Sequence, residues 1–100
     1  MNEFLTFLSL CRKSGAVVFG FDAVKGALEK GKVKTIFLSI DLSDKSRKEV
    51  LYFAGKSGTE VVHTKLEMDD FWKSLGKRTG IVAVCDENFS NALKARIDKA

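Results

Sequence analysis

Proline is absent from this 100-residue sequence, and histidine, cysteine and tryptophan are rare, with one, two and one residue respectively. Without proline, helices can run to their ends without a break and connections can stay short. Cys11 and Cys85 lie far apart and do not have the spacing of metal ligands, so we expect neither a disulfide scaffold nor a metal site. We interpret both as small core residues.

A long hydrophobic run is also missing. The longest apolar stretch near the start, residues 4–11, is shorter than the ~20 residues that a membrane helix needs. Glu3 precedes this stretch and the basic pair Arg12 and Lys13 follows it, which is the reverse of the charge order in a signal peptide. We therefore expect a soluble, cytoplasmic monomer that does not enter a membrane.

Residues 1–100 are expected to form a single globular domain, because 45% of the chain is hydrophobic and 30% is charged. Helical and strand-like patterns alternate along it. Helices are expected from a cap at Asn2 to a break at Ser14, and over residues 21–30, 43–54, 65–75 and 88–99; strands are expected at 16–19, 35–40, 60–63 and 81–85. This alternation predicts an α/β sandwich with helices on both faces of the sheet, but it does not give the strand order.

Two of these helices have more specific signatures. Thr64 and Glu67 have the spacing of a capping box, in which each side chain bonds to the other residue's backbone amide. The apolar residues that follow at helical spacing are predicted to face the core: Met68, Phe71, Trp72 and Leu75. In the helix before, Val50, Leu51 and Ala54 are expected to point inward.

Positive charge is concentrated in the first third of the chain. From residue 12 to residue 34, six bases against two acids give a charge of +4, equal to that of the whole chain; the bases are Arg12, Lys13, Lys25, Lys30, Lys32 and Lys34. This stretch contains Gly20, at a strand-to-helix junction where unpaired amides and the helix dipole favour an anion. Solvated lysines on a helix surface give the same pattern, so charge alone does not identify a partner.

A second basic loop lies between a helix and the last strand. It consists of Gly76, Lys77, Arg78, Thr79 and Gly80. If this loop and the Gly20 junction lie at one end of the sheet, together they suit a phosphate backbone. Phe21, next to Gly20, would either stack on a base or staple its own helix. The alternative is that Gly20 only caps a helix and the loop is a simple turn.

Signals for catalysis are weak, and we predict neither an enzyme nor a cofactor. His63 is the single histidine, and nothing in the sequence links it to a nucleophile. Residues 26–33, GALEKGKV, imitate a phosphate-binding P-loop. Val33 stands where a serine or threonine must bind Mg²⁺, and the stretch falls within and after a helix, so the match fails.

Five segments occur in an order and register that covers almost the whole chain: residues 8–15 (LSLCRKSG), 20–24 (GFDAV), 31–41 (GKVKTIFLSID), 74–77 (SLGK) and 83–89 (AVCDENF). Together they resemble the L-seven-Ae / L-thirty-e superfamily of ribosomal proteins, and most closely its small bacterial YlxQ-like branch. The resemblance implies a three-layer α/β/α sandwich around a mixed four-stranded sheet. It also implies a ribosome-associated protein whose partner is structured RNA, either ribosomal RNA or a kink-turn, a sharply bent internal loop built on sheared G·A pairs.

The resemblance also implies where the RNA would bind. In the family, the start of the second helix meets the G·A pairs, and a loop before the last strand covers a flipped-out nucleotide. The corresponding helix residues are Gly20, Phe21, Asp22, Ala23, Lys25 and Gly26, and the corresponding loop residues are Gly76, Lys77, Arg78, Thr79 and Gly80. Phosphate contacts are expected from Arg12, Lys13, Lys32, Lys77 and Arg78, with no catalytic residue among them.

The helix start departs from the strongest binders of the family. Those proteins have asparagine, glutamate and lysine where this chain has Asp22, Ala23 and Gly26. An ionised Asp22 accepts hydrogen bonds but cannot donate them. We therefore expect weaker or altered RNA recognition. Two alternatives remain open: a protein-interaction module on the same scaffold that has lost specific RNA binding, and an enzyme or small-anion binder that uses the Gly20 helix terminus.

Overall fold

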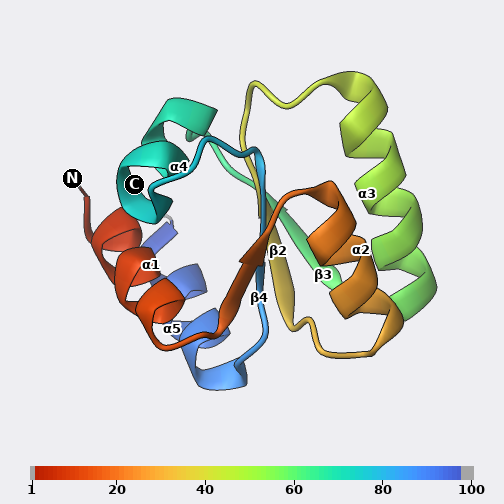
Figure 1. The fold of residues 1–100 in the computed structure, drawn as a ribbon, viewed down its shortest axis with the longest axis horizontal. Coiled ribbons are helices and arrows are strands. Elements are labelled where there is room, and N and C mark those ends of the chain that lie inside the picture. The colour runs from red at the N-terminus through yellow and green to blue at the C-terminus, as the bar shows by residue number, and fades with distance from the viewer. Residues whose placement is uncertain (1, 98–100) are drawn as a thin grey trace.

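A computed structural model describes residues 2–97, in which five helices alternate with four strands (Figure 1). In chain order the elements are α1 (Glu3–Lys13), β1 (Val17–Phe19), α2 (Phe21–Glu29), β2 (Thr35–Leu38), α3 (Asp44–Ser57), β3 (Glu60–His63), α4 (Met68–Leu75), β4 (Ile81–Val84) and α5 (Glu87–Ile97). None of the helices within this range is both long and apolar enough to cross a membrane.

The four strands form one mixed sheet in the order β1-β4-β2-β3. β4 runs antiparallel to its neighbours β1 and β2, and β2 is parallel to β3. The last residues of β1 and β2, Phe19 and Leu38, therefore pair near the start of β4, with Val82 and Ile81. We call this edge, where β1, β2 and β3 end and β4 begins, the carboxyl end of the sheet.

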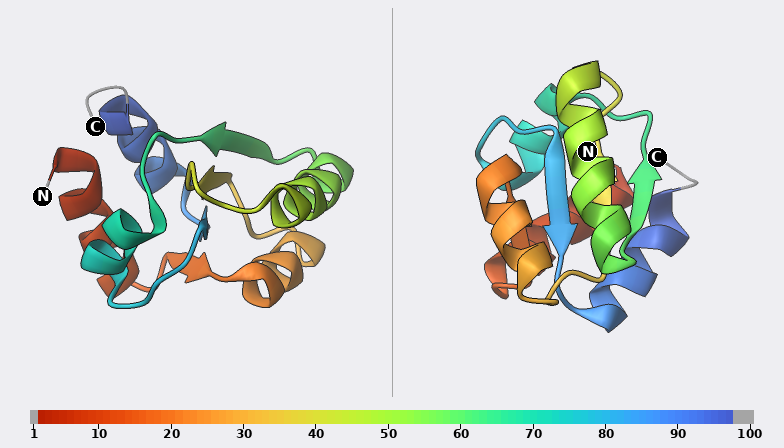
Figure 2. Two further views of the ribbon diagram at one scale, coloured as in Figure 1. Left: turned by 90° about the horizontal axis from the view of Figure 1, so that it is seen from above. Right: turned by 90° about the vertical axis from the view of Figure 1, so that its right-hand side faces the viewer.

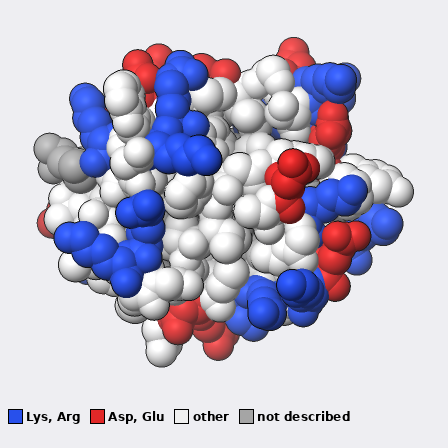
Figure 3. Space-filling view, in the orientation of Figure 1, with Lys and Arg blue, Asp and Glu red and all other residues white. Residues whose placement is uncertain are grey.

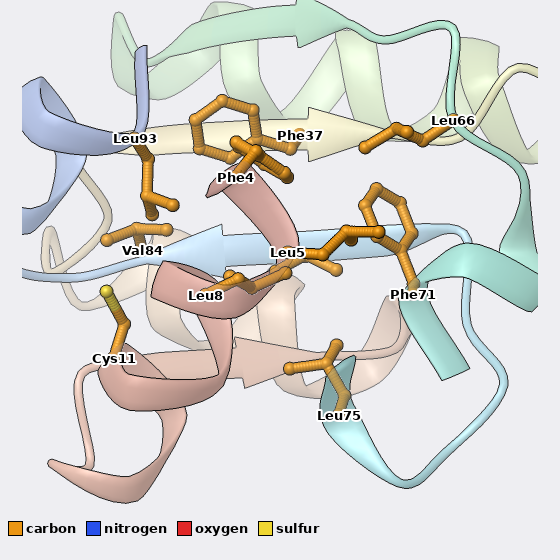
Figure 4. Packing of buried hydrophobic residues seen from close by; sticks show 11 residues of the cluster. Phe4, Leu5, Leu8, Cys11, Phe37, Leu66, Phe71, Leu75, Val84 and Leu93 are labelled. Atoms are coloured by element: carbon orange, nitrogen blue, oxygen red, sulfur yellow. The ribbon is translucent and has the colours of Figure 1, made fainter. Parts of the chain in front are cut away.

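Helices cover both faces of the sheet, as the alternation predicts. α1, α4 and α5 pack on one face and α2 and α3 on the other (Figure 2). β2 is buried over all four residues because Phe37 points into the first layer while Ile36 and Leu38 point into the second. Figure 4 shows Phe37 against Phe4 of α1, with ring centroids 5.1 Å apart in an edge-to-face arrangement. The predicted three-layer α/β/α sandwich and its mixed four-stranded sheet are confirmed.

Several local predictions are also confirmed. The Asn2 carboxamide oxygen accepts a 2.8 Å hydrogen bond from the Leu5 amide and so caps α1. α2 ends where expected, and Gly31 follows its last turn with a φ of 69°. The predicted final helix is α5, although residues 98 and 99 lie outside the described range.

Other local predictions are wrong. α3 continues through Ser57 and ends at Gly58, because Gly55 is accommodated within the helix. Thr64 does not cap α4: its hydroxyl donates to the Leu38 carbonyl (2.7 Å), which ties β3 to β2. The Glu67 amide instead donates to the Asp70 carboxylate at 2.9 Å, so the reciprocal cap begins three residues later.

Two hydrophobic residues expected in the core lie on the surface. Leu51 is 39% exposed because the buried face of α3 is narrower than the sequence pattern indicates and includes only Val50 and Ala54. Trp72 is 54% exposed, although the flanking Phe71 and Leu75 of α4 are completely buried.

Candidate nucleic-acid interface

Gly20 joins β1 to α2 at the carboxyl end of the sheet. Its φ of 91° and ψ of 153° lie in a region that only glycine adopts readily. Its amide donates to the Ile81 carbonyl (3.0 Å), and its own carbonyl accepts the first helical bond, from the Val24 amide (3.1 Å). This pair of bonds holds the N-terminus of α2 against the first residue of β4.

The 76–80 loop leads into that same residue of β4, so the two predicted elements lie beside each other. Gly76 ends α4 in the left-handed conformation. The Thr79 hydroxyl bonds both the amide and the carbonyl of Ile81, at 3.2 Å each, and Thr79 is buried. A side-chain carbon added at the buried Gly80 would lie 2.6 Å from the Ser39 hydroxyl oxygen. Thr79 and Gly80 therefore shape the loop from inside, whereas Lys77 and Arg78 are exposed.

Arg78 has a partner within the protein. Its Nε atom lies 3.0 Å from the Asp69 carboxylate of α4, in a pair whose side chains are 57% and 67% exposed. Its Nη1 atom approaches the Met68 sulfur at 3.6 Å. An incoming phosphate would therefore compete with Asp69 for this guanidinium.

Replacing Asp69 by asparagine is expected to raise affinity for RNA, because the change removes a negative charge and frees Arg78. Exposed ion pairs contribute at most about 1 kcal/mol, so the free energy of unfolding should change little. Because solvent and salt screen interactions between exposed charges, we expect affinity to rise by roughly two- to fivefold. Titration at low salt measures it, with Asp44→Asn on α3 as a control for the loss of one exposed acid. An unchanged affinity would show that Arg78 takes no part in RNA binding.

A shallow groove of about 350 Å³ runs along the outer side of α2, beside the edge strand β1. It is lined by Val18, Asp22, Ala23, Gly26, Ala27, Lys30 and Lys32. Asp22 lies in the first turn of α2, and Lys30 and Lys32 lie at and after its end. Four of the predicted site residues thus lie on one surface: Asp22, Ala23, Gly26 and Lys32. Small residues, Ala23 and Gly26, form the middle of this surface.

Phe21 and Lys25 face a different way. The Phe21 ring packs edge-to-face on Phe53 of α3, with centroids 6.1 Å apart. The Lys25 ammonium lies 4.7 Å from the centre of the same Phe53 ring. Both side chains therefore face α3, whereas Asp22 faces the groove. The Phe21 contact joins α2 to α3 and is not a staple within α2.

Arg12 and Lys13 lie at the end of α1, on the other side of β1. The Arg12 guanidinium carbon is 5.7 Å from the centre of the Phe19 ring, the residue before Gly20. Figure 3 looks onto the β1 edge and shows basic side chains at both flanks, over the α1 and α4 side and over the lower end of α2. Largely uncharged surface lies between them. The predicted phosphate-binding residues thus occur on opposite sides of an uncharged strip.

Sequence reasoning missed a polar cluster at the carboxyl end of the sheet. Arg47 of α3 donates to the Ser39 carbonyl (2.7 Å) and lies 2.9 Å from the His63 Nδ1 atom. The Asp41 carboxylate accepts a 3.0 Å bond from the Met68 amide at the start of α4. Desolvation opposes ionisation of Asp41, but the hydrogen bonds that its carboxylate accepts hold its pKa below the ordinary value. These hydrogen bonds connect α3 to β3 and to the residue after β2, and they connect Asp41 to the start of α4. No local sequence motif predicts them, because their partners are far apart in the chain.

The two cysteines are free thiols, as expected. Cys11 is one of the buried residues of α1, and Cys85, directly after β4, is partly buried. Burial raises the pKa of both thiols, so they stay protonated near neutral pH.

Comparison with known proteins gives structural but not sequence matches. No protein-family model matches the chain, and no curated protein matches it by sequence. A protein of unknown function from Bacillus halodurans C shares the fold with a TM-score of 0.88 and 25% identity, over 98% of this chain and 99% of that one. The Giardia lamblia 15.5kD RNA binding protein matches with a TM-score of 0.75 and 13% identity, over 97% of this chain and 83% of that one. An RNA-binding protein of known structure therefore has the same fold.

Proposed function

We propose that this protein is a non-enzymatic, ribosome-associated binder of structured RNA, with preference for a kink-turn or a similarly bent loop. One observation carries the proposal: the bond from the Gly20 amide to the Ile81 carbonyl, which holds the start of α2 beside the 76–80 loop. Structured RNA is recognised by its shape and by unpaired bases that are splayed out, and two adjacent elements can contact these two features.

The family resemblance supports this assignment. Its five sequence segments occur in register, and the Giardia lamblia 15.5kD RNA binding protein has the same fold. We assign the chain to the YlxQ-like branch of the L-seven-Ae / L-thirty-e superfamily on this basis, and we propose the bacterial ribosome as its setting.

The groove along α2 suits RNA chemically. The free amides at the start of α2 favour a phosphate or a base acceptor. Asp22 can accept hydrogen bonds from the N1–H and N2–H₂ groups of guanine. Ala23 and Gly26 let a backbone approach α2 closely, and Lys30 and Lys32 provide positive charge where the groove ends.

Binding to a standard kink-turn RNA, compared with a mutant lacking its G·A pairs, tests the proposal directly. Both RNAs are titrated by calorimetry or gel shift at two salt concentrations. Tight, salt-sensitive binding that disappears with the G·A pairs would support shape-specific recognition. Equal and weak binding to both RNAs would overturn it and leave only general attraction to polyanions.

Neutralising Lys30 and Lys32 together, as glutamines, is expected to weaken RNA binding and to flatten its dependence on salt. Each phosphate contact contributes about 0.7–0.9 to the slope of log affinity against log salt concentration, so the slope should fall by roughly 1.4–1.8. The double variant of the exposed Lys45 and Lys48 on α3 removes the same charge away from the groove and serves as control. If both pairs change the slope equally, the groove is not where phosphates bind.

A protein-interaction module is the second candidate function. The observation that favours it is apolar surface on α3, where Tyr52 is 62% exposed beside the exposed Leu51. Failure of the kink-turn titration, together with capture of a protein partner that Leu51→Ser abolishes, would establish this alternative.

A further inference from the structure

Trp72 is the only tryptophan of the chain and lies on the surface of a helix whose orientation is fixed. Phe71 and Leu75 on its two sides in sequence are fully buried, and the Ser74 hydroxyl donates to the Leu5 carbonyl of α1 at 2.6 Å. These contacts fix the rotation of α4 and leave the Trp72 side chain 54% exposed. A ring of this size outside the core is unusual without a partner.

Trp72 lies in the last turn of α4, directly before the 76–80 loop. The Gly76 amide donates to the Trp72 carbonyl at 2.8 Å, so the loop begins one turn beyond Trp72. Met68, one turn before Trp72 on the same side of α4, contacts the Arg78 guanidinium through its sulfur at 3.6 Å. Arg78 therefore folds back along the side of the helix that carries Trp72.

Charges of both signs occur around Trp72: Asp69, which pairs with Arg78, lies one turn before it on α4, and basic residues follow it. Lys73 follows Trp72 directly, and Lys77 and Arg78 are exposed in the loop. The contact surfaces of protein complexes are enriched in tryptophan, methionine and arginine but depleted in lysine, whereas sites for single-stranded nucleic acid combine lysine and arginine with exposed aromatic rings. Lys73 and Lys77 are therefore the neighbours of Trp72 that favour RNA over protein as the partner.

We propose that Trp72 is a stacking platform for an unpaired RNA base, which extends the proposed RNA site from the groove of α2 across the 76–80 loop onto α4. The base lies flat on the indole ring, while Lys77 and Arg78 bind the phosphates on either side of it. The inference rests on the proposed RNA-binding function and assigns to it a residue that the sequence pattern places in the core.

Intrinsic fluorescence provides a specific readout, because Trp72 is the only source of tryptophan emission. A bent RNA with an unpaired nucleotide is titrated into the full chain, and a fully paired duplex of equal length and inorganic polyphosphate are titrated in parallel. Stacking predicts saturable quenching with the first RNA and much weaker quenching with the other two. Equal quenching by all three would overturn the inference, because it would report only the approach of a polyanion.

Variants at this position separate stacking from charge. Trp72→Leu removes the aromatic ring and is expected to lower affinity for the bent RNA roughly 5- to 150-fold, the range found when a stacking ring is removed. Trp72→Phe retains a smaller ring and should restore part of the loss. Tyr52→Leu on α3 removes an equally exposed ring at a different site and should leave affinity within about twofold. Circular dichroism confirms that each variant is folded.

The outcomes distinguish this inference from the function on which it rests. If Trp72→Leu binds as tightly as the unchanged protein while the Lys30 and Lys32 variant is impaired, the stacking role is refuted and the RNA site along α2 stands. If the unchanged protein binds neither RNA, the proposed function fails, and the stacking role fails with it. Loss in Trp72→Leu with partial recovery in Trp72→Phe supports both.

Discussion

Substituting asparagine for Gly20 is expected to lower the free energy of unfolding by about 1–3 kcal/mol, which is the cost of holding a residue with a side chain in a glycine-only backbone region. The φ of 91° and ψ of 153° at Gly20 lie in that region. Within residues 2–97, no atom beyond Gly20 and its two neighbours lies within 4 Å of where the added carbon would sit, so the cost comes from the backbone and not from a clash. Urea denaturation of the two proteins measures the difference.

Gly58 offers a matched control for this substitution. It also has positive φ, but its φ of 65° and ψ of 28° are left-handed helical values that asparagine tolerates. Gly58→Asn should therefore cost less than about 1 kcal/mol. Equal destabilisation by the two substitutions would show that the Gly20 conformation carries no special strain for other residues.

Gly20→Asn has a functional consequence that Gly58→Asn should lack. If the backbone at position 20 relaxes, the hydrogen bond from its amide to the Ile81 carbonyl is weakened, and the start of α2 moves relative to the 76–80 loop. Affinity for bent RNA should fall by more than tenfold, a loss typical of misplaced recognition groups. Titration at a temperature where both variants are folded separates this loss from unfolding.

The sequence predicts the elements of this fold more successfully than their neighbours in space. Hydrophobic periodicity and the glycines that end helices are signals within short stretches of sequence, and they locate each helix and strand to within a few residues. The strand order depends on contacts between distant segments, such as Phe19 with Val82 in the sheet. Periodicity therefore could not predict that Gly20 and the 76–80 loop meet, although that meeting defines the candidate site.

The errors at single residues have the same origin. Phe71 and Trp72 are adjacent apolar residues, and only the packing of α4 against α1 decides which of them is buried. Thr64 has the spacing of a helix cap, but its hydroxyl donates its hydrogen bond to the Leu38 carbonyl of β2. In each case a contact between distant segments outweighs a local pattern.

Gly26→Ala is expected to make the protein more stable and a poorer RNA binder. Gly26 lies in the middle of α2, where alanine is preferred to glycine by about 0.5–1 kcal/mol. Among the described residues, no atom outside the adjacent residues and the backbone of α2 lies within 4 Å of the added methyl group, so packing within the protein does not require a glycine at this position. The methyl group would instead project into the groove that Ala23, Gly26 and Lys30 line, where we place the RNA backbone.

Gly55→Ala on α3 is the matched control. Gly55 is also helical, and in the part of the chain that the structure describes the added carbon likewise meets no atom within 4 Å beyond its neighbours and the backbone of α3; Gly55 does not line the groove. Both substitutions should raise the midpoint of urea denaturation, while only Gly26→Ala should weaken binding to bent RNA, by roughly tenfold for a methyl group that keeps a close backbone contact from forming. If Gly26→Ala binds RNA as well as Gly55→Ala does, RNA does not approach α2 at this turn. Opposite effects of one methyl group on stability and on affinity would instead mean that the helix forgoes stability at Gly26 to admit its partner.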